Sequence, residues 1–510
     1  MSRLLLHNAH VHTQDIQHPY ATSILVDGER IIAVGDETLL LEAGDIQKID
    51  IGGRHIFPGL HDAHIHIWKV GNLLTNMLDL RGVGSIDEMQ QRLSDYARSH
   101  PELTWIQARG FNEVIFPDKR IPNKLDIDAV ISDRPVVITR TCAHQVVANS
   151  KALLLAGLDK NMQPVPGGEI KYLASGELSG HFTETAIGLI LKAVPKYTAA
   201  ELRNMVLTAQ DAFLKLGITA ACDPAVDRDL LEVYKQMDAD GELRMRINAI
   251  PIRVPDGSQK IYPNPQHYYS SHLVVNTVKF FADGGLSGKT AALRLPYLND
   301  TSKGVMRLEK EQFYQLALES QEAGFKIATH AIGDAAVDLV LQVYDNLPLS
   351  NIEHRLEHVG FVDDNHLDIM YRRKVSAVMQ PIFIRELGKN FIVSLDKKRL
   401  DSIYPIHTIA AHGINVALST DAPVVRSFDP RTNMLAAQTR ETEEGIVIGA
   451  SEILDHKQST AMYTHGSSVA VGNVANIGTI AKGRYCDLVI HDFPDLSGSA
   501  EVWLSGSKIR

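Results

Sequence analysis

Cysteine is scarce in this sequence. The 510 residues include only three, Cys142, Cys222 and Cys486, and they lie far apart in the chain. Three scattered cysteines exclude a disulfide framework and a CxxC metal or redox motif. Because disulfides mark oxidising compartments, this pattern favours a reduced setting, and we expect a cytoplasmic protein.

The sequence also lacks a surplus of basic residues and any long apolar run. It has 51 Lys and Arg against 61 Asp and Glu, a formal net charge of −10, and only 6% aromatic residues. Nucleic-acid-binding proteins need a basic surface, so this composition argues against one. No apolar stretch approaches the roughly 18 residues that cross a bilayer, and the apolar run at 4–6 is too short for a signal peptide. We therefore expect a small-molecule substrate and no nucleic-acid or membrane partner, and we leave a homo-oligomer open.

Motifs of three other enzyme classes are missing. A phosphate-binding GxxxxGK[ST] loop ending in Lys289 and Thr290 would need glycine at position 283, which is Asp283. No GxGxxG follows an early strand, so a Rossmann dinucleotide site has no support. The segment HGSSV at 465–469 is not the GxSxG elbow of a serine hydrolase.

Short apolar strands alternate with helical segments through most of the chain. In the predicted helix 308–324, Phe313, Leu316 and Ala317 have the i, i+3, i+4 spacing of a buried face. Strand–helix alternation is typical of a parallel sheet covered by helices, and eight such units favour a closed (β/α)₈ TIM-type barrel within an α/β fold. The predicted strands are residues 59–67, 217–223, 244–252, 276–284, 325–333, 355–361, 374–381 and 415–423.

The remaining segments predict two additions to this barrel. Residues 1–57 and 470–510 both contain short strands separated by turns, and neither end has enough strands for a stable sheet alone. We expect them to form one small composite β-sandwich domain beside a barrel at 58–469. Residues 68–216 are too many for a barrel connection, so they predict an α/β insertion after the first barrel strand.

The 22 histidines include two HxH pairs. His64 and His66 fall on the first predicted strand, where residues i and i+2 share a face and two imidazoles can bind one metal ion. The alternative interpretation is an ordinary polar strand end. We interpret the second pair, His10 and His12, as surface residues of the N-terminal β-segment.

Further candidates lie late in other predicted strands: Lys279, His330, His358 and Asp421. Each alone has a simpler explanation, such as an ion pair, a helix cap, a core histidine or a turn. Together, five of the eight predicted strands end in groups that bind a cation directly or after modification. A barrel gathers its strand ends at one mouth, so we predict a metal site there.

Several segments carry a family resemblance: PGLHDAHIH, VKFFADG, ATHAIGD, RLEHV and STDAP. They resemble the metal-dependent amidohydrolase superfamily, and more narrowly its amidohydrolase-3 branch with N-substituted formamide deformylase-like proteins. The resemblance implies one or two divalent ions, most commonly zinc, and a carboxylated lysine at Lys279 when two ions are bridged; a single ion with unmodified lysine is the alternative. The implied metal ligands are His64, His66, Lys279, His330, His358 and Asp421.

The implied reaction is hydrolysis of a non-peptide carbon–nitrogen bond by metal-bound hydroxide, with an amide or N-substituted formamide as substrate. Asp421 would act as general base and then general acid. Asp283 and Glu357 lie beside implied ligands and are expected to support them. A deaminase or cyclic-amide hydrolase on the same scaffold, and a non-catalytic regulatory relative, are the alternatives.

The sequence departs from the family pattern at three places. His61 replaces the usual hydrophobic residue before Asp62, and we expect it to support the site or the fold. Cys142 replaces an aspartate in the insertion, while His144 is retained as a candidate substrate contact. Lys289 stands where arginine is common, so an anionic group of a substrate would be held differently there.

Overall fold

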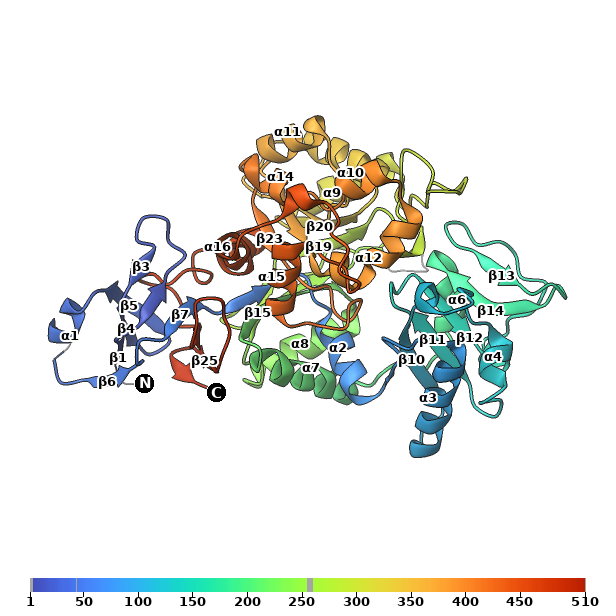
Figure 1. The fold of residues 1–510 in the computed structure, drawn as a ribbon, viewed down its shortest axis with the longest axis horizontal. Coiled ribbons are helices and arrows are strands. Elements are labelled where there is room, and N and C mark those ends of the chain that lie inside the picture. The colour runs from blue at the N-terminus through green and yellow to red at the C-terminus, as the bar shows by residue number, and fades with distance from the viewer. Residues whose placement is uncertain (1–2, 43, 255–259, 510) are drawn as a thin grey trace.

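The computed structural model describes residues 3–42, 44–254 and 260–509. Residues 1–2, 43 and 510 of the predicted composite domain, and residues 255–259 of the predicted barrel, lie outside the described residues. Figure 1 shows three regions in a row, with both chain ends on one side of a central α/β region and the insertion on the other. No helix among the described residues is both long and apolar enough to cross a membrane.

All eight predicted central strands are present, and most are shorter than expected. They pair in parallel within two sheets, whose orders are β17-β18-β16-β15-β8 and β19-β20-β21-β22-β23. Only β17 (Tyr268–Tyr269) runs antiparallel to its neighbour β18 (Leu273–Val275). The predicted strands correspond to β8 (Leu60–Asp62), β15 (Ile218–Val226), β16 (Arg246–Pro251), β19 (Thr277–Phe281), β20 (Lys326–Ala331), β21 (Arg355–His358), β22 (Ser376–Met379) and β23 (Val416–Leu418).

The two parallel sheets meet at both edges. Ile252, which follows β16, forms a parallel bridge with Lys279 on β19. At the other edge, the backbone N–H of Ala63 after β8 donates to the carbonyl oxygen of Leu418 on β23, at 3.2 Å. The carboxyl ends of strands from both sheets therefore open toward one region of the molecule.

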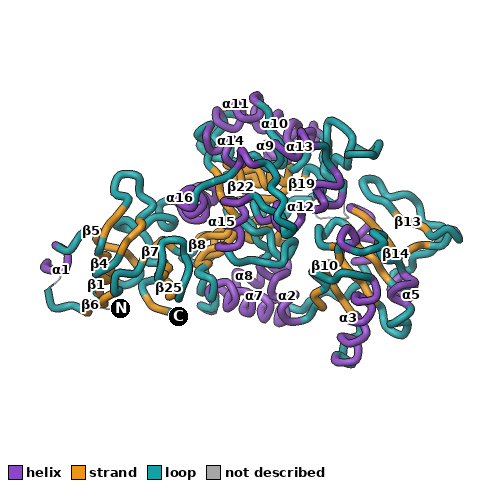
Figure 2. Tube along the Cα trace, viewed as in Figure 1, coloured by secondary structure: helices purple, strands orange, loops and turns teal. Residues whose placement is uncertain are grey.

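Helices surround the central strands, as the purple and orange segments of Figure 2 show. In α9, Phe313, Leu316 and Ala317 are buried, which confirms the predicted apolar face. Asp227 caps α8 and Asp363 caps α11, each accepting a backbone N–H in the first turn, as short polar residues favour. The helices are α2 (Ile67–Thr75), α7 (Ala199–Leu214), α8 (Arg228–Ala239), α9 (Lys310–Glu322), α10 (Asp334–Asn346), α11 (Asp364–Arg372), α12 (Ile382–Ser394), α13 (Lys397–Asp401), α14 (Ile406–Ala411), α15 (Pro430–Thr439), α16 (His456–Ala461) and α17 (Ser467–Val471).

Strands from the two chain ends pair with each other. β7 is antiparallel to β24, with Ile56 opposite Ile490. The sheet β26-β25-β24-β7-β2-β3 and the sheet β5-β4-β1-β6 share a buried cluster that includes Leu6, Ile24 and Trp503. These sheets contain β1 (Leu4–His7), β2 (His10–His12), β3 (Tyr20–Ala21), β4 (Ser23–Asp27), β5 (Arg30–Gly35), β6 (Gln47–Asp50), β7 (His55–Pro58), β24 (Leu488–His491), β25 (Ala500–Leu504) and β26 (Ser507–Lys508), with α1 (Thr38–Glu42) between β5 and β6.

The insertion has a six-stranded sheet of order β13-β14-β12-β11-β10-β9 and two buried clusters of its own. The helices that flank it in sequence, α2 and α7, instead bury Val70 and Met205 in the main cluster. Its elements are β9 (Leu78–Asp79), α3 (Ile86–Ser99), β10 (Ile106–Phe111), α4 (Lys124–Asp128), β11 (Val136–Arg140), β12 (Gln145–Ala148), α5 (Ser150–Leu155), β13 (Ile170–Tyr172), β14 (Leu178–Thr183) and α6 (Ile187–Leu191).

Candidate metal centre

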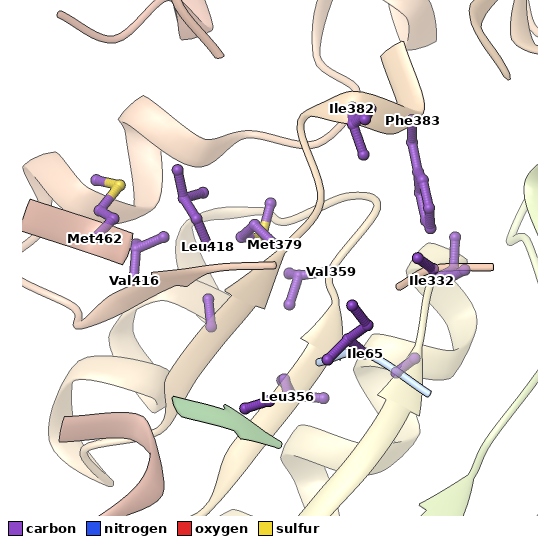
Figure 3. Packing of buried hydrophobic residues seen from close by; sticks show 14 of the residues in the cluster. Ile65, Ile332, Leu356, Val359, Met379, Ile382, Phe383, Val416, Leu418 and Met462 are labelled. Carbon is purple, nitrogen blue, oxygen red and sulfur yellow. The ribbon is translucent and has the colours of Figure 1, made fainter. Parts of the chain in front are cut away.

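His64 and His66 lie just beyond β8, not on it. The prediction of a strand over 59–67 is wrong because β8 ends at Asp62, whose carboxylate accepts the backbone N–H of His64 at 3.1 Å. The same carboxylate accepts the hydroxyl of Thr420 at 2.7 Å, which ties this turn to the segment after β23. His66 then precedes α2 as its N-cap residue. The side chain of Ile65, between the two histidines, packs in the core near Leu356 and Val359, as Figure 3 shows.

Asp421 brings a carboxylate to these two imidazoles. Its Oδ1 atom lies 3.4 Å from His64 Nε2 and 3.2 Å from His66 Nε2. Asp421 follows β23 in a left-handed conformation with φ of 59°, and its N–H donates to the carbonyl oxygen of His64 at 2.8 Å. The three residues form a buried group whose ligand atoms are close enough to hold one metal ion.

The other ring nitrogen of each histidine already has an acceptor. His64 Nδ1 lies 2.5 Å from Glu357 Oε2, and His66 Nδ1 lies 3.2 Å from the carbonyl oxygen of Pro224. When both Nδ1–H groups donate to these oxygens, both Nε2 atoms present lone pairs toward Asp421. Asp421 Oδ1 has no well-aligned hydrogen bond with any described residue. Three acceptor atoms therefore converge, and a cation satisfies them.

His330 on β20 and His358 at the end of β21 complete a histidine group. Their ring centroids are 4.5 Å apart, and those of His358 and His64 are 4.8 Å apart. His358 Nδ1 lies 2.7 Å from Gln380 Oε1, and His330 Nε2 lies 3.1 Å from the carbonyl oxygen of Gly284. Each ring therefore has one nitrogen on a protein acceptor and one available for a ligand bond, as in metal sites whose outer contacts fix the tautomer.

Lys279 on β19 is fully buried near this group. Its Nζ lies 4.8 Å from the centroid of the Phe281 ring. Burial lowers the pKa of both His330 and His358, and the charge of Lys279 adds to that effect. The predicted lysine is thus close enough to act on two predicted ligands.

Glu357 contacts a ligand from another strand. It lies next to His358 in sequence, yet its carboxylate contacts His64 and forms an ion pair with Arg355 at 2.5 Å. Burial raises the pKa of Glu357, but the charge of Arg355 outweighs burial and holds it well below the usual range. The ionised carboxylate therefore fixes the orientation of His64.

The charge state of the group suits a metal. Burial lowers the pKa of His66 and His358 to about 3, so both rings are neutral at pH 7. Burial raises the pKa of Asp421, but His64 outweighs it and holds that pKa well below its usual value. Burial opposes charge on His64, and the carboxylates of Asp421 and Glu357 outweigh burial and raise its pKa. Neutral His66 and His358 and ionised Asp421 are in the forms that bind metals, whereas His64 gives up a proton when it binds one.

The insertion contributes His144 to the same cavity. His144 and Glu184 lie at the same end of the paired strands β12 and β14, and their side chains are 3.0 Å apart. Burial lowers the pKa of His144, but Glu184 outweighs burial and raises it to about 9. Its ring centroid is 5.9 Å from that of His330. Glu184 was not predicted, because only the pairing of β12 with β14 brings it to His144.

Of the two remaining candidates, Asp283 contacts a histidine of the group, whereas Lys289 does not line the cavity. Asp283 accepts backbone N–H groups of Ala292, Ile332 and Gly333 at 2.8–3.0 Å, and its carboxylate is 3.4 Å from His330 Nε2. Lys289 is not among the cavity residues; its Nζ lies 3.6 Å from Asp300.

Two residues that depart from the family pattern, His61 and Cys142, have different surroundings. His61 is buried, with its Nε2 3.5 Å from Cys222 Sγ, so it packs in the fold. Cys142 lines the cavity beside His144.

A cavity of about 90 Å³ opens above the histidines. His64, His66, His330, His358 and Asp421 line it. Apolar side chains also line it and form an apolar wall, which we define as Leu286, Phe383, Leu387 and Phe391. No pattern in the sequence distinguishes this wall, because its α12 residues have the spacing of any buried helix face.

The comparisons identify the family. The sequence profile described as Amidohydrolase family matches residues 47–501. The chain belongs to the amidohydrolase family. This membership confirms the predicted resemblance and marks the protein as a metal-dependent hydrolase of that family.

Relatives cover nearly the whole amidohydrolase chain. YtcJ of Bacillus subtilis is 28% identical over 502 residues, which are 96% of this chain and 94% of that one. The N-substituted formamide deformylase of Arthrobacter pascens is 25% identical over 517 residues, 96% of this chain and 94% of that one. The crystal structure of an uncharacterized metal-dependent hydrolase from Pyrococcus furiosus is 25% identical, with a TM-score of 0.75 over 97% of this chain and 100% of that one.

Proposed function

We propose that this amidohydrolase hydrolyses a non-peptide carbon–nitrogen bond, in an amide or an N-substituted formamide. The observation that carries the proposal is the convergence of Asp421 Oδ1 with His64 Nε2 and His66 Nε2, in which both nitrogens lie within 3.4 Å of the carboxylate oxygen. This group borders a cavity large enough for a small molecule. The name of the Arthrobacter pascens relative supports the bond type.

We also propose the (β/α)₈ barrel as the architecture, with a β-sandwich formed by the terminal strands. The parallel pairing of eight strands and the contacts at both sheet edges support the barrel. The cluster shared by the two terminal sheets supports the sandwich. In such barrels the active site lies at the carboxyl ends of the strands, where the histidine group lies here.

The residues fit a divalent ion, and zinc is the metal that we propose. His64, His66 and Asp421 would hold one ion, His330 and His358 would hold a second, and Lys279, when carboxylated, would be a further ligand. When bound, zinc supplies a Lewis acid and lowers the pKa of water toward about 7. Glu357, Gln380 and the carbonyl of Pro224 hold the ligand rings in place by accepting their N–H groups.

The chain's own groups provide the proton transfer. Asp421 is ionised, borders the cavity and is placed to take a proton from the attacking water and pass it to the leaving nitrogen. His144 lies just before β12 of the insertion, and Glu184 holds its ring. It is placed to donate a hydrogen bond to the carbonyl oxygen of the substrate. The apolar wall excludes water from the remaining side of the cavity.

Metal removal and a substrate panel test the proposal. The protein is dialysed against a chelator, reloaded with zinc, and assayed at each stage on N-formyl and N-acyl amines, with hydantoins and amino-purines as competing classes. We expect turnover of the amides that disappears without metal and returns on reloading. Turnover that survives complete metal removal contradicts the proposal, and faster turnover of the ring substrates favours the deaminase or cyclic-amide hydrolase. Full metal loading without turnover of any compound favours a non-catalytic role.

A further inference from the structure

A second histidine cluster lies away from the cavity, on the sheet formed by the chain ends. His10 and His12 are on β2, and His55 is on β7, the parallel neighbour of β2. His10 and His12 share a face because they are two residues apart on one strand, and His10 is directly opposite His55. The interpretation of His10 and His12 as surface residues holds for His10, whereas His12 is half-buried.

The three rings are close and partly fixed. His12 Nε2 lies 2.9 Å from His55 Nδ1, and the centroid of the His10 ring lies 4.9 Å from that of His55. The ring of His12 stacks on Phe57, with centroids 4.3 Å apart and planes 2° apart. Tyr20 packs edge-on against the other side of His12, at 5.7 Å. These contacts hold His12 in place before any ligand binds.

His12 and His55, the two less exposed residues of the cluster, are neutral at pH 7. Burial lowers the pKa of His12 to about 4, and His55 and His10 lower it further. Burial and His10 also lower the pKa of His55. In the contact between His12 Nε2 and His55 Nδ1, one neutral ring donates its N–H to the lone pair of the other. A metal ion binds both nitrogens once the donor ring takes its other tautomer, and no proton has to leave a charged imidazole.

We propose that His10, His12 and His55 form a second metal site, which binds a divalent transition ion such as zinc. Two imidazole nitrogens on one tetrahedral zinc ion, each at 2.0–2.1 Å, are about 3.3 Å apart. The nitrogens of His12 and His55 are 2.9 Å apart, so a small opening of this pair admits the ion. The exposed His10 rotates on the same face to supply the third nitrogen, and water completes the coordination.

The imidazole cluster differs in its ligand atoms and its charge from an acidic cluster elsewhere in the molecule. Asp338, Asp363 and His366 each bring a ligand atom within 4.8 Å of the others, a distance that His10 reaches only by rotating toward His12 and His55. The guanidinium of Arg294 forms ion pairs with both carboxylates there, so their charge is already compensated. An all-imidazole site selects zinc, nickel or copper over magnesium and calcium, which prefer oxygen ligands.

The proposed ion would join two strands of the terminal sheet. β2 contributes His10 and His12, and β7 contributes His55. β7 also pairs with β24 from the other end of the chain. The site thus lies where the N-terminal segment meets the C-terminal strands, far from the proposed chemistry.

Counting bound ions tests this site independently of catalysis. The holoenzyme, with its cavity site loaded, is equilibrated with increasing zinc, and bound metal per chain is measured. We expect wild type to bind one more ion per chain than the H12N/H55N variant, and H10N to bind that ion about tenfold more weakly, having lost one of three ligands. H18N is the matched control, because His18 is an exposed histidine of the same domain outside the cluster, and it keeps the extra ion.

Amidohydrolase activity should be unchanged in all these variants, which separates this proposal from the proposed function. Equal ion counts in wild type and H12N/H55N overturn the site. Copper added to the zinc-loaded wild-type protein provides a measurement that needs no variant. Nitrogen hyperfine splitting in its electron paramagnetic resonance spectrum is expected, and a spectrum of oxygen ligands alone overturns the site.

Discussion

The two HxH pairs have the same spacing and different surroundings. His64 and His66 are 2% and 8% exposed, follow the parallel strand β8 and share the carboxylate of Asp421. His10 is exposed and His12 half-buried, and their nearest partner is a third imidazole, His55. In each pair the residue between the histidines is buried, so the backbone aims both rings away from the core.

The difference shows that the third partner determines what a histidine pair can do. An ionised carboxylate next to two imidazoles suits a metal site with its own proton acceptor, which hydrolysis requires. Imidazoles alone can hold an ion but have no group to accept a proton from bound water. The carboxylate at His64 and His66 comes from a segment more than 350 residues later, so the fold creates this difference.

Substituting each histidine pair in turn should give the largest difference in metal content and turnover between the two regions. We expect H64A/H66A to lose the cavity metal and all detectable turnover, because two of the three converging ligands are gone. H10A/H12A should keep both the cavity metal and turnover. Metal analysis and rates on the best amide of the panel measure the effect, and a cavity metal retained by H64A/H66A would refute the ligand assignment.

Asp421→Asn tests whether the carboxylate is what distinguishes the pairs. The amide keeps an oxygen for the metal but cannot accept a proton, so kcat should fall by about 10²–10⁴. Most of the metal should remain bound. Wild-type rates in purified D421N, with metal content checked in parallel, would show that the proton passes through another group.

Glu357→Gln tests the support behind His64. Loss of its charge should weaken metal binding by about 10–100-fold, since the contact that orients a ligand ring is lost. It also leaves the buried Arg355 without its charge partner, which should cost about 3–5 kcal/mol of unfolding free energy. Glu319→Gln is the matched control, because Glu319 also pairs with an arginine but is 59% exposed, and little change is expected. Equal metal affinity in E357Q and wild type would contradict the support role.

A fall in pH should slightly reduce the folding stability that His12 of the second pair contributes. The pKa of His12 is about 4 in the folded chain and about 6.5 in unfolded chains, so the unfolded chain takes up the proton first as pH falls. The stability that neutral His12 contributes is therefore complete above pH 6.5 and is lost as pH falls toward 4. In chelator, wild type should lose about 1–2 °C more in Tm than H12Q between pH 7 and pH 5. Parallel Tm curves for the two proteins would show that His12 does not titrate as described.

The central strands and the general position of the site could be predicted because both depend on local pattern. Short apolar runs that end in polar residues, such as the run ending at His330, became parallel strands with those residues at their carboxyl ends. The family motifs then added His64, His66, His330, His358 and Asp421, which the structure brings to one cavity. Gln380 follows β22 in the same way, so the strand-end rule could have found it.

The details that the sequence pattern did not predict depend on contacts between residues that are distant in sequence. The first strand ends at Asp62 because that carboxylate binds the backbone of His64 and the hydroxyl of Thr420, and no local pattern indicates this. Glu357 contacts His64 and not its sequence neighbour because adjacent residues of a strand face opposite ways. Glu184 and the apolar wall became part of the cavity only when the insertion and α12 packed around it.

The pairing of β7 with β24 affects the order in which the protein can be completed during synthesis. β7 ends at Pro58 and its partner β24 begins at Leu488, so more than 400 residues are synthesised between the two strands. Until β24 is made, β7 has an open edge of unpaired backbone groups, the kind of edge that joins other chains. A ribosome that stalls before residue 488 would therefore release a chain with a complete set of central parallel strands and an unprotected, aggregation-prone sheet.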